Sequence, residues 1–260
     1  MKKVMLMIKK YGCFFVLIGV LLFISCDPGD NSNIIPSPLD RLNLAKKFVD
    51  ELNRYNERSN VEEMFYLKKI HGISDTTNNY IVVKDEHSGL YNAYDLNKYT
   101  QGMTYDAFIK NAGEKGVIDN LFNNQDGTFT DRFNIEWIFE DTSPSTKDLE
   151  KIGALKDEMK IANVREGLAA DFGLSEERSA QIAKLVLQWN KLEKRRAMTD
   201  EDVRAFSKEL LGVDLNTALN AYKKSLQGDK HELDLFIKKA SEANFITPEK
   251  MQLILNQIVK

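Results

Sequence analysis

The sequence predicts an α+β protein with an N-terminal helix, a small antiparallel β-sheet and a C-terminal all-α region of several helices. Three observations carry this prediction. Apolar residues follow helical spacing over 39–57, strand-like segments fill 62–141, and helix-capping residues recur from 146 to the end. The 260 residues are enough for one large or two small domains.

The first element is a predicted amphipathic helix at 39–57. Its apolar residues recur every three or four positions, which places them on one helical face. These residues are Leu42, Ala45, Phe48, Val49, Leu52 and Tyr55.

The region 62–141 predicts an antiparallel sheet of three or four strands. Segments 64–70 and 80–83 have strand-forming composition, and the turn residues 85–89 followed by 90–94 predict a hairpin. A second turn is expected at 123–127. In 133–140 the alternation of Phe133, Ile135, Trp137 and Phe139 with their neighbours predicts a strand with one aromatic face inward.

Residues 142–145 (Thr-Ser-Pro-Ser) predict a boundary, and the pattern beyond them is helical. Ser175 and Thr199 are expected N-caps, and Pro248 occupies a first helical position. The predicted helices are 146–172, 175–196, 199–211, 214–227, 229–244 and 247–259.

The N-terminus has the layout of an export signal. Lys2, Lys3, Lys9 and Lys10 precede the apolar stretch 13–25, which is too short to be a comfortable membrane span. Cys26 follows directly, and Asp27-Pro28-Gly29-Asp30 after it cannot continue a helix.

The junction 22–26 (Leu-Phe-Ile-Ser-Cys) resembles the lipobox of bacterial lipoproteins, with Phe23 where that family usually has Leu, Val or Ile. The resemblance implies cleavage before Cys26 and acyl chains such as palmitate on its sulfur and new amino group. Several chains anchor a protein stably, so membrane lipid is an expected partner. An ordinary signal peptide cut near Ser25, or an uncleaved anchor, is the alternative.

The expected location is the cell envelope, and the outer membrane is favoured over the inner. Asp27 resembles an inner-membrane retention signal of enteric bacteria, but that rule does not hold in all lineages. The predicted organisation is a lipoprotein signal peptide at 1–25, a flexible tether at 26–38, a small α+β domain at 39–145 and a helical domain at 146–260.

The helical domain is also similar to uncharacterised lipoproteins of predatory Gram-negative bacteria. The similar segments are 147–151, 173–179, 197–200 and 209–213. They are mostly cap and packing motifs, so the resemblance implies no activity and no functional residue.

Composition excludes some classes of function. The formal net charge is −3, and no basic face typical of a nucleic-acid binder is evident. Cys13 and Cys26 are the only cysteines, so the chain after an acylated Cys26 has no thiol for a disulfide or a nucleophile. The three histidines, His71, His87 and His231, do not form a local metal motif. We therefore predict no metal site, no cofactor and no nucleic-acid partner.

The predicted sheet is rich in tyrosine. Exposed on a sheet, Tyr66, Tyr80, Tyr91 and Tyr94 would form a binding surface for a glycan or for an extended segment of an envelope protein. The alternative is cross-strand packing in a small sheet.

These observations favour a lipid-anchored envelope protein that acts as a binding or scaffolding module. The sequence contains no recognisable catalytic motif, so no catalytic residue is predicted. An envelope hydrolase with a site assembled from distant residues is the alternative, and a structural spacer is a third.

Overall fold

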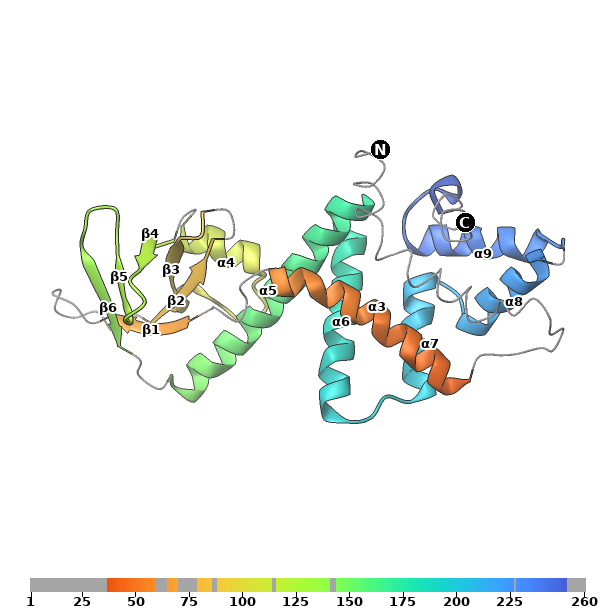
Figure 1. Ribbon diagram of the computed structural model, residues 1–260, viewed down its shortest axis with the longest axis horizontal. Coiled ribbons are helices and arrows are strands. Elements are labelled where there is room, and N and C mark those ends of the chain that lie inside the picture. The colour runs from red at the N-terminus through yellow and green to blue at the C-terminus, as the bar shows by residue number, and fades with distance from the viewer. Residues whose placement is uncertain are drawn as a thin grey trace. The chain divides into compact units, whose positions relative to one another are not determined.

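The computed structural model describes residues 37–58, 65–69, 79–85, 88–113, 116–140, 144–226 and 228–251. It confirms the α+β architecture: in chain order, an N-terminal helix is followed by the strands and then by a C-terminal helical region, as the colours of Figure 1 show. Contacts divide the chain into two units, Met1–Tyr55 with Val164–Lys260, and Asn56–Asn163. We call these the helical unit and the barrel unit. The predicted signal peptide, Cys26 and most of the tether lie outside the described residues.

The division differs from the predicted domains 39–145 and 146–260. Helix α3 (Pro38–Arg58) belongs mostly to the helical unit. The C-terminal boundary of the barrel unit, between Asn163 and Val164, falls inside helix α5 (Thr146–Phe172) rather than at 142–145. The physical reason is packing, because Leu155 and Met159 of α5 are buried in a core cluster of the barrel unit. A Pro- and Ser-rich link between elements is therefore not the edge of a unit in this chain.

Among the described residues of the barrel unit, six strands form a closed antiparallel barrel in sequence order. They are β1 (Phe65–Lys69), β2 (Asn79–Lys84), β3 (Tyr91–Asp95), β4 (Ile118–Asn123), β5 (Thr128–Thr130) and β6 (Glu136–Glu140). The barrel closes where β6 pairs with β1 through Lys68↔Glu140 and Lys69↔Phe139. The predicted count of three or four strands was too low because β4 and β5 show little period-two alternation.

Two core clusters lie on opposite faces of β2. Tyr80 and Val82 belong to the first, with residues of β3, β4 and β5. Ile81 and Val83 belong to the second, which contains Phe108 of helix α4 (Tyr105–Ala112) and the start of α5. Because both faces are covered, four consecutive residues of β2 are buried. A short 3₁₀ turn, η2 (Leu96–Lys98), follows β3.

The prediction that 133–140 is one strand with its aromatic side chains facing inward was wrong for residues 133–135. β6 begins only at Glu136, and Phe133 and Ile135 are 69% and 52% exposed. Asn134 has a left-handed backbone, with φ of 60°, which breaks the alternation of a strand. Only Trp137, which is half-buried, keeps the predicted orientation among the side chains described there.

The helical unit follows the prediction closely. Helices α6 (Glu176–Arg195), α7 (Asp200–Leu211), α8 (Leu215–Leu226) and α9 (His231–Ala243) lie within a few residues of the predicted ranges. Ser175 and Thr199 are N-caps, and Thr199 forms a capping box with Asp202. Within the described ranges, no helix is both long and apolar enough to cross a membrane.

A candidate ligand-binding cavity in the barrel unit

The barrel unit contains an open cavity of about 370 Å³. Its wall combines strand and loop residues that are distant in sequence. Tyr80 comes from β2 and Trp137 from β6, while the residue before β4, the start of β4 and the loop between β5 and β6 supply the rest. Those remaining residues are Val117, Ile118, Asp119, Asp131, Arg132 and Phe133. A volume of this size suits a small organic ligand, since ligand pockets span about 300–1,000 Å³.

A β-bulge brings Asp119 to the cavity. The pairing of β3 with β4 passes from Tyr91↔Leu121 to Ala93↔Ile118, so β4 uses one more residue than β3 over the same stretch. Asn120 takes up the extra length with a φ of 55°, and its backbone N–H donates to Asn92 Oδ1 at 3.1 Å. Bulges of this kind redirect a side chain from its regular place on the strand.

The loop before β4 is held tightly against β3. The backbone N–H of Val117 donates to the Ala93 carbonyl at 2.7 Å. Gly116 has a φ of 86°, and a Cβ added there would lie 2.7 Å from the same carbonyl oxygen. Only glycine fits this close approach. The result is that Val117, which is 52% exposed, is fixed at the cavity rim.

Asp131 holds the opposite loop in shape. Its Oδ1 accepts the backbone N–H groups of Phe133 at 2.8 Å and Ile135 at 2.9 Å, and its Oδ2 accepts the indole N–H of Trp137 at 3.1 Å. Two backbone bonds, Asp131 N–H to Ile135 O and Asn134 N–H to Asp131 O, close the same turn at 3.0 Å. One carboxylate thus connects the loop to β6.

The pKa of Asp131 is set by opposing influences. Burial, the largest of them, raises the pKa, because the side chain is only 7% exposed. The hydrogen bonds from Ile135, Trp137 and Phe133, together with the charge of Arg132, favour the ionised form, and the net result is a pKa below the ordinary value. Asp131 therefore remains an acceptor for its three donors at neutral pH.

The braced loop presents Arg132 and Phe133 at the mouth of the cavity. Phe133 is the most exposed large apolar side chain of the described residues, and the Arg132 guanidinium carbon lies 4.9 Å from the centre of its ring. An exposed aromatic ring on a rigid loop can bind a ligand without the cost of first ordering the backbone.

The predicted tyrosine surface does not form as expected. Tyr80, Tyr91 and Tyr94 are 3%, 8% and 5% exposed, so packing, the alternative from the sequence, accounts for these three side chains. Tyr91 packs edge-on against Phe129 at 5.5 Å between ring centres, and Tyr94 packs on Phe108 at 6.0 Å. Only Tyr80 reaches the cavity. The backbone of Tyr66 lies in β1, but its side chain, like Cys26, lies outside the described part.

Sequence reasoning missed most of the cavity. Asp119, Asp131 and Arg132 carry its charges, and none of them was a candidate. The segment Asp131-Arg132-Phe133-Asn134 does contain a turn signal, because Asp and Asn favour turns and tolerate a left-handed backbone. The period-two pattern of the following aromatics hid that signal.

Comparisons with protein families, curated proteins and solved structures give no match for this chain. The resemblance to lipoproteins therefore stays a prediction from the sequence. In the part of the chain that the structure describes, no group of three or more metal-ligating side chains is placed to hold a metal ion.

Proposed function

We propose that the protein is a lipid-anchored cell-envelope protein whose barrel unit binds a small organic ligand. The observation that carries the binding function is the cavity itself, whose three aromatic rings and few charged groups come from separate elements. This composition is typical of small-molecule sites. A glycan or a side chain of an envelope protein would supply such a ligand.

The environment of Asp131 argues against a role for this residue as a general acid. A general acid needs a pKa raised towards the working pH, whereas that of Asp131 is lowered. Both of its oxygens already accept hydrogen bonds from the protein. Its role is to shape the site, which fits a preorganised binding cavity.

The proposed anchor rests on Cys26 and the apolar segment before it. To test it, the precursor and its Cys26→Ala variant are expressed in a Gram-negative host, and mass and detergent partitioning are compared. Cys13→Ala is the matched control, because Cys13 is the only other cysteine. We expect acyl mass on a chain starting at Cys26 in the wild type and in Cys13→Ala, and its loss in Cys26→Ala. An unacylated wild-type chain would refute the anchor.

The cavity is tested through its tryptophan. The chain has two tryptophans, and Trp137 lines the cavity while Trp189 is 3% exposed in the helical unit. The full-length ¹⁵N-labelled protein should give two indole N–H signals, with the Trp137 signal identified by its loss in Trp137→Phe. We add choline, 3,3-dimethyl-1-butanol, methyl β-glucoside and acetate one at a time. Selective movement of the Trp137 signal by at least one probe is expected, and no selective response to any probe would contradict the proposal.

A further inference from the structure

We propose that the cavity selects an organic cation, an ammonium group on a small apolar body. The inference rests on the proposed binding function and specifies its ligand. It follows from two independent features of the lining, its aromatic rings and its balance of charge.

The aromatic rings come from three separate elements. Tyr80 lies on β2, Phe133 on the braced loop and Trp137 on β6, and all three line one cavity. Aromatic faces attract cations within about 6 Å of the ring centre, and sites with several rings are used to bind quaternary ammonium groups. The aliphatic side chains of Val117 and Ile118 complete an apolar wall for the body of such a ligand.

The structure contains an example of this attraction at the cavity mouth. The guanidinium of Arg132 lies over the ring of Phe133, with 4.9 Å from Cζ to the ring centre. Phe133 thus contacts a cation of the protein itself. A ligand ammonium would interact with the remaining aromatic surface in the same way.

The charges of the lining favour a cation over an anion. Asp119 and Asp131 supply two carboxylates to the wall against the one guanidinium of Arg132. Three N–H donors satisfy the carboxylate of Asp131, so Asp119 is the group that would pair with the ligand. An anionic ligand would instead meet two like charges.

Choline and 3,3-dimethyl-1-butanol separate charge from shape, because the second replaces the quaternary nitrogen of the first with carbon. We measure both affinities by titration of the Trp137 indole signal, with Trp189 as the internal reference. Choline should bind at least about twofold more tightly than its neutral analogue, the factor that corresponds to the lower end of a cation–π contribution. Equal affinities, or selective binding of acetate or of methyl β-glucoside alone, would overturn the cation inference and leave the binding function standing. If no probe shifts the Trp137 indole signal, the cation inference and the proposed binding function are both refuted.

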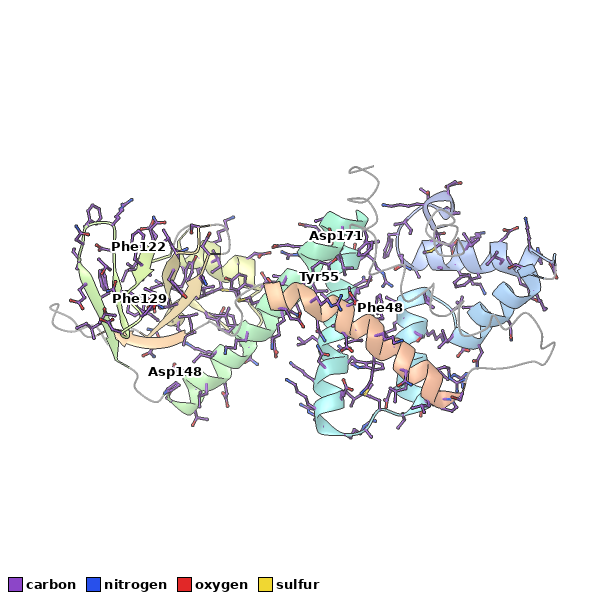
Figure 2. The ribbon with its side chains drawn as sticks, in the orientation of Figure 1. Phe48, Tyr55, Phe122, Phe129, Asp148 and Asp171 are labelled. Atoms are coloured by element: carbon purple, nitrogen blue, oxygen red, sulfur yellow. The ribbon has the colours of Figure 1, made fainter. Side chains whose placement is uncertain are left out.

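Substitutions test which side chains are responsible for the preference for choline. Asp119→Asn removes the carboxylate that would pair with the ligand charge, so it should weaken choline binding about fivefold and leave the neutral analogue unchanged. Glu150→Gln, the same charge change on α5, should alter neither affinity. Phe133→Ala should also weaken choline. Phe122→Ala is its matched control, because Phe122 on β4 (Figure 2) is 51% exposed on the same unit. Phe122 is not among the residues that line the cavity. Phe133 is exposed, and asparagine has nearly the shape of aspartate, so both variants should keep the fold. An unchanged choline affinity in both Asp119→Asn and Phe133→Ala would refute the proposal.

Discussion

The ring of Tyr55 lies directly against the backbone of Gly167. A Cβ added at Gly167 would be 2.2 Å from Cδ1 of the tyrosine ring. The Tyr55 hydroxyl donates to Asp171 Oδ2 at 2.8 Å, one helical turn further along α5 (Figure 2). The absence of a side chain at Gly167 therefore sets how closely α3 and α5 approach within the helical unit.

Substitutions of two glycines on α5 test this contact. Alanine is the better helix former by about 1 kcal/mol, so Gly153→Ala, where an added Cβ meets nothing within 4 Å, should raise the free energy of unfolding by up to that amount. Gly167→Ala should lower it by about 1–3 kcal/mol, because overpacking forces the helices apart. Denaturant unfolding of the two variants measures the difference. Equal effects would mean that the Tyr55 contact does not constrain α5.

Buried Arg178 connects three helices of the helical unit. Its guanidinium donates to the carbonyls of Glu209 and Leu210 at the end of α7 and to Asn244 Oδ1 after α9. Burial lowers the pKa of the guanidinium, and the charge of Glu209 opposes that effect. Arg178→Met would remove the guanidinium donor from the Glu209 carbonyl and Asn244 Oδ1, while the Leu210 carbonyl would keep the side-chain amide of Asn244. The expected cost is about 3 kcal/mol in the free energy of unfolding.

The control for Arg178 is Arg204→Met. Arg204 pairs with Asp214 at 2.9 Å, but its side chain is 47% exposed. An exposed ion pair contributes little to stability, because water and salt screen it, so this variant should unfold nearly as the wild type does. Similar losses in the two variants, measured in the same denaturant series, would contradict the role assigned to Arg178.

Asp202 should make the helical unit sensitive to acid. Arg196 and the Thr199 cap hold the pKa of Asp202 well below its ordinary value of 3.8. A group whose pKa is lower in the folded state stabilises the fold above the ordinary pKa, and that contribution is lost as the pH falls below it. Asp202→Asn should therefore melt at a lower temperature than the wild type at pH 7. The gap between the two melting temperatures should narrow at pH 3.

Glu201→Gln is the control for the simple loss of a negative charge. Glu201 lies on the same first turn of α7 but outside the capping box. Its melting temperature should follow the wild type at both pH values. A constant gap between Asp202→Asn and the wild type from pH 7 to pH 3 would exclude a titrating contribution from Asp202.

Loss of the Asp131 carboxylate should disorganise the cavity. Asp131→Ala removes the acceptor for two backbone N–H groups and for Trp137, so we expect a shifted Trp137 indole signal and loss of probe binding. Asp126→Ala is the comparison, because Asp126 braces the turn between β4 and β5 through Thr128. An unchanged Trp137 signal in Asp131→Ala would show that the loop keeps its shape without the carboxylate.

Short sequence motifs predicted the parts of the fold that depend on interactions between residues close together in the sequence. The Ser175 cap and the Thr199 capping box depend on residues three positions apart, and both form as predicted. Barrel closure could not be predicted in this way, because the contact of Lys69 with Phe139 joins positions far apart in sequence. The cavity was missed for a related reason. The bulge at Asn120 and the turn at Asn134 depend on left-handed backbone conformations that period-two reasoning ignores.

The barrel unit is contiguous in sequence, and it interrupts the sequence of the helical unit. Asn163 Nδ2 donates to Asn56 Oδ1 at 3.4 Å, so the first and last residues of the barrel unit touch each other. The barrel unit is thus an inserted unit whose two ends lie next to each other, the arrangement in which domain insertion and circular permutation are tolerated. It also delays assembly. During synthesis, the ribosome makes α3 first and then the whole barrel unit. Only afterwards does it make Val164 and the later residues that pack with α3 in the helical unit.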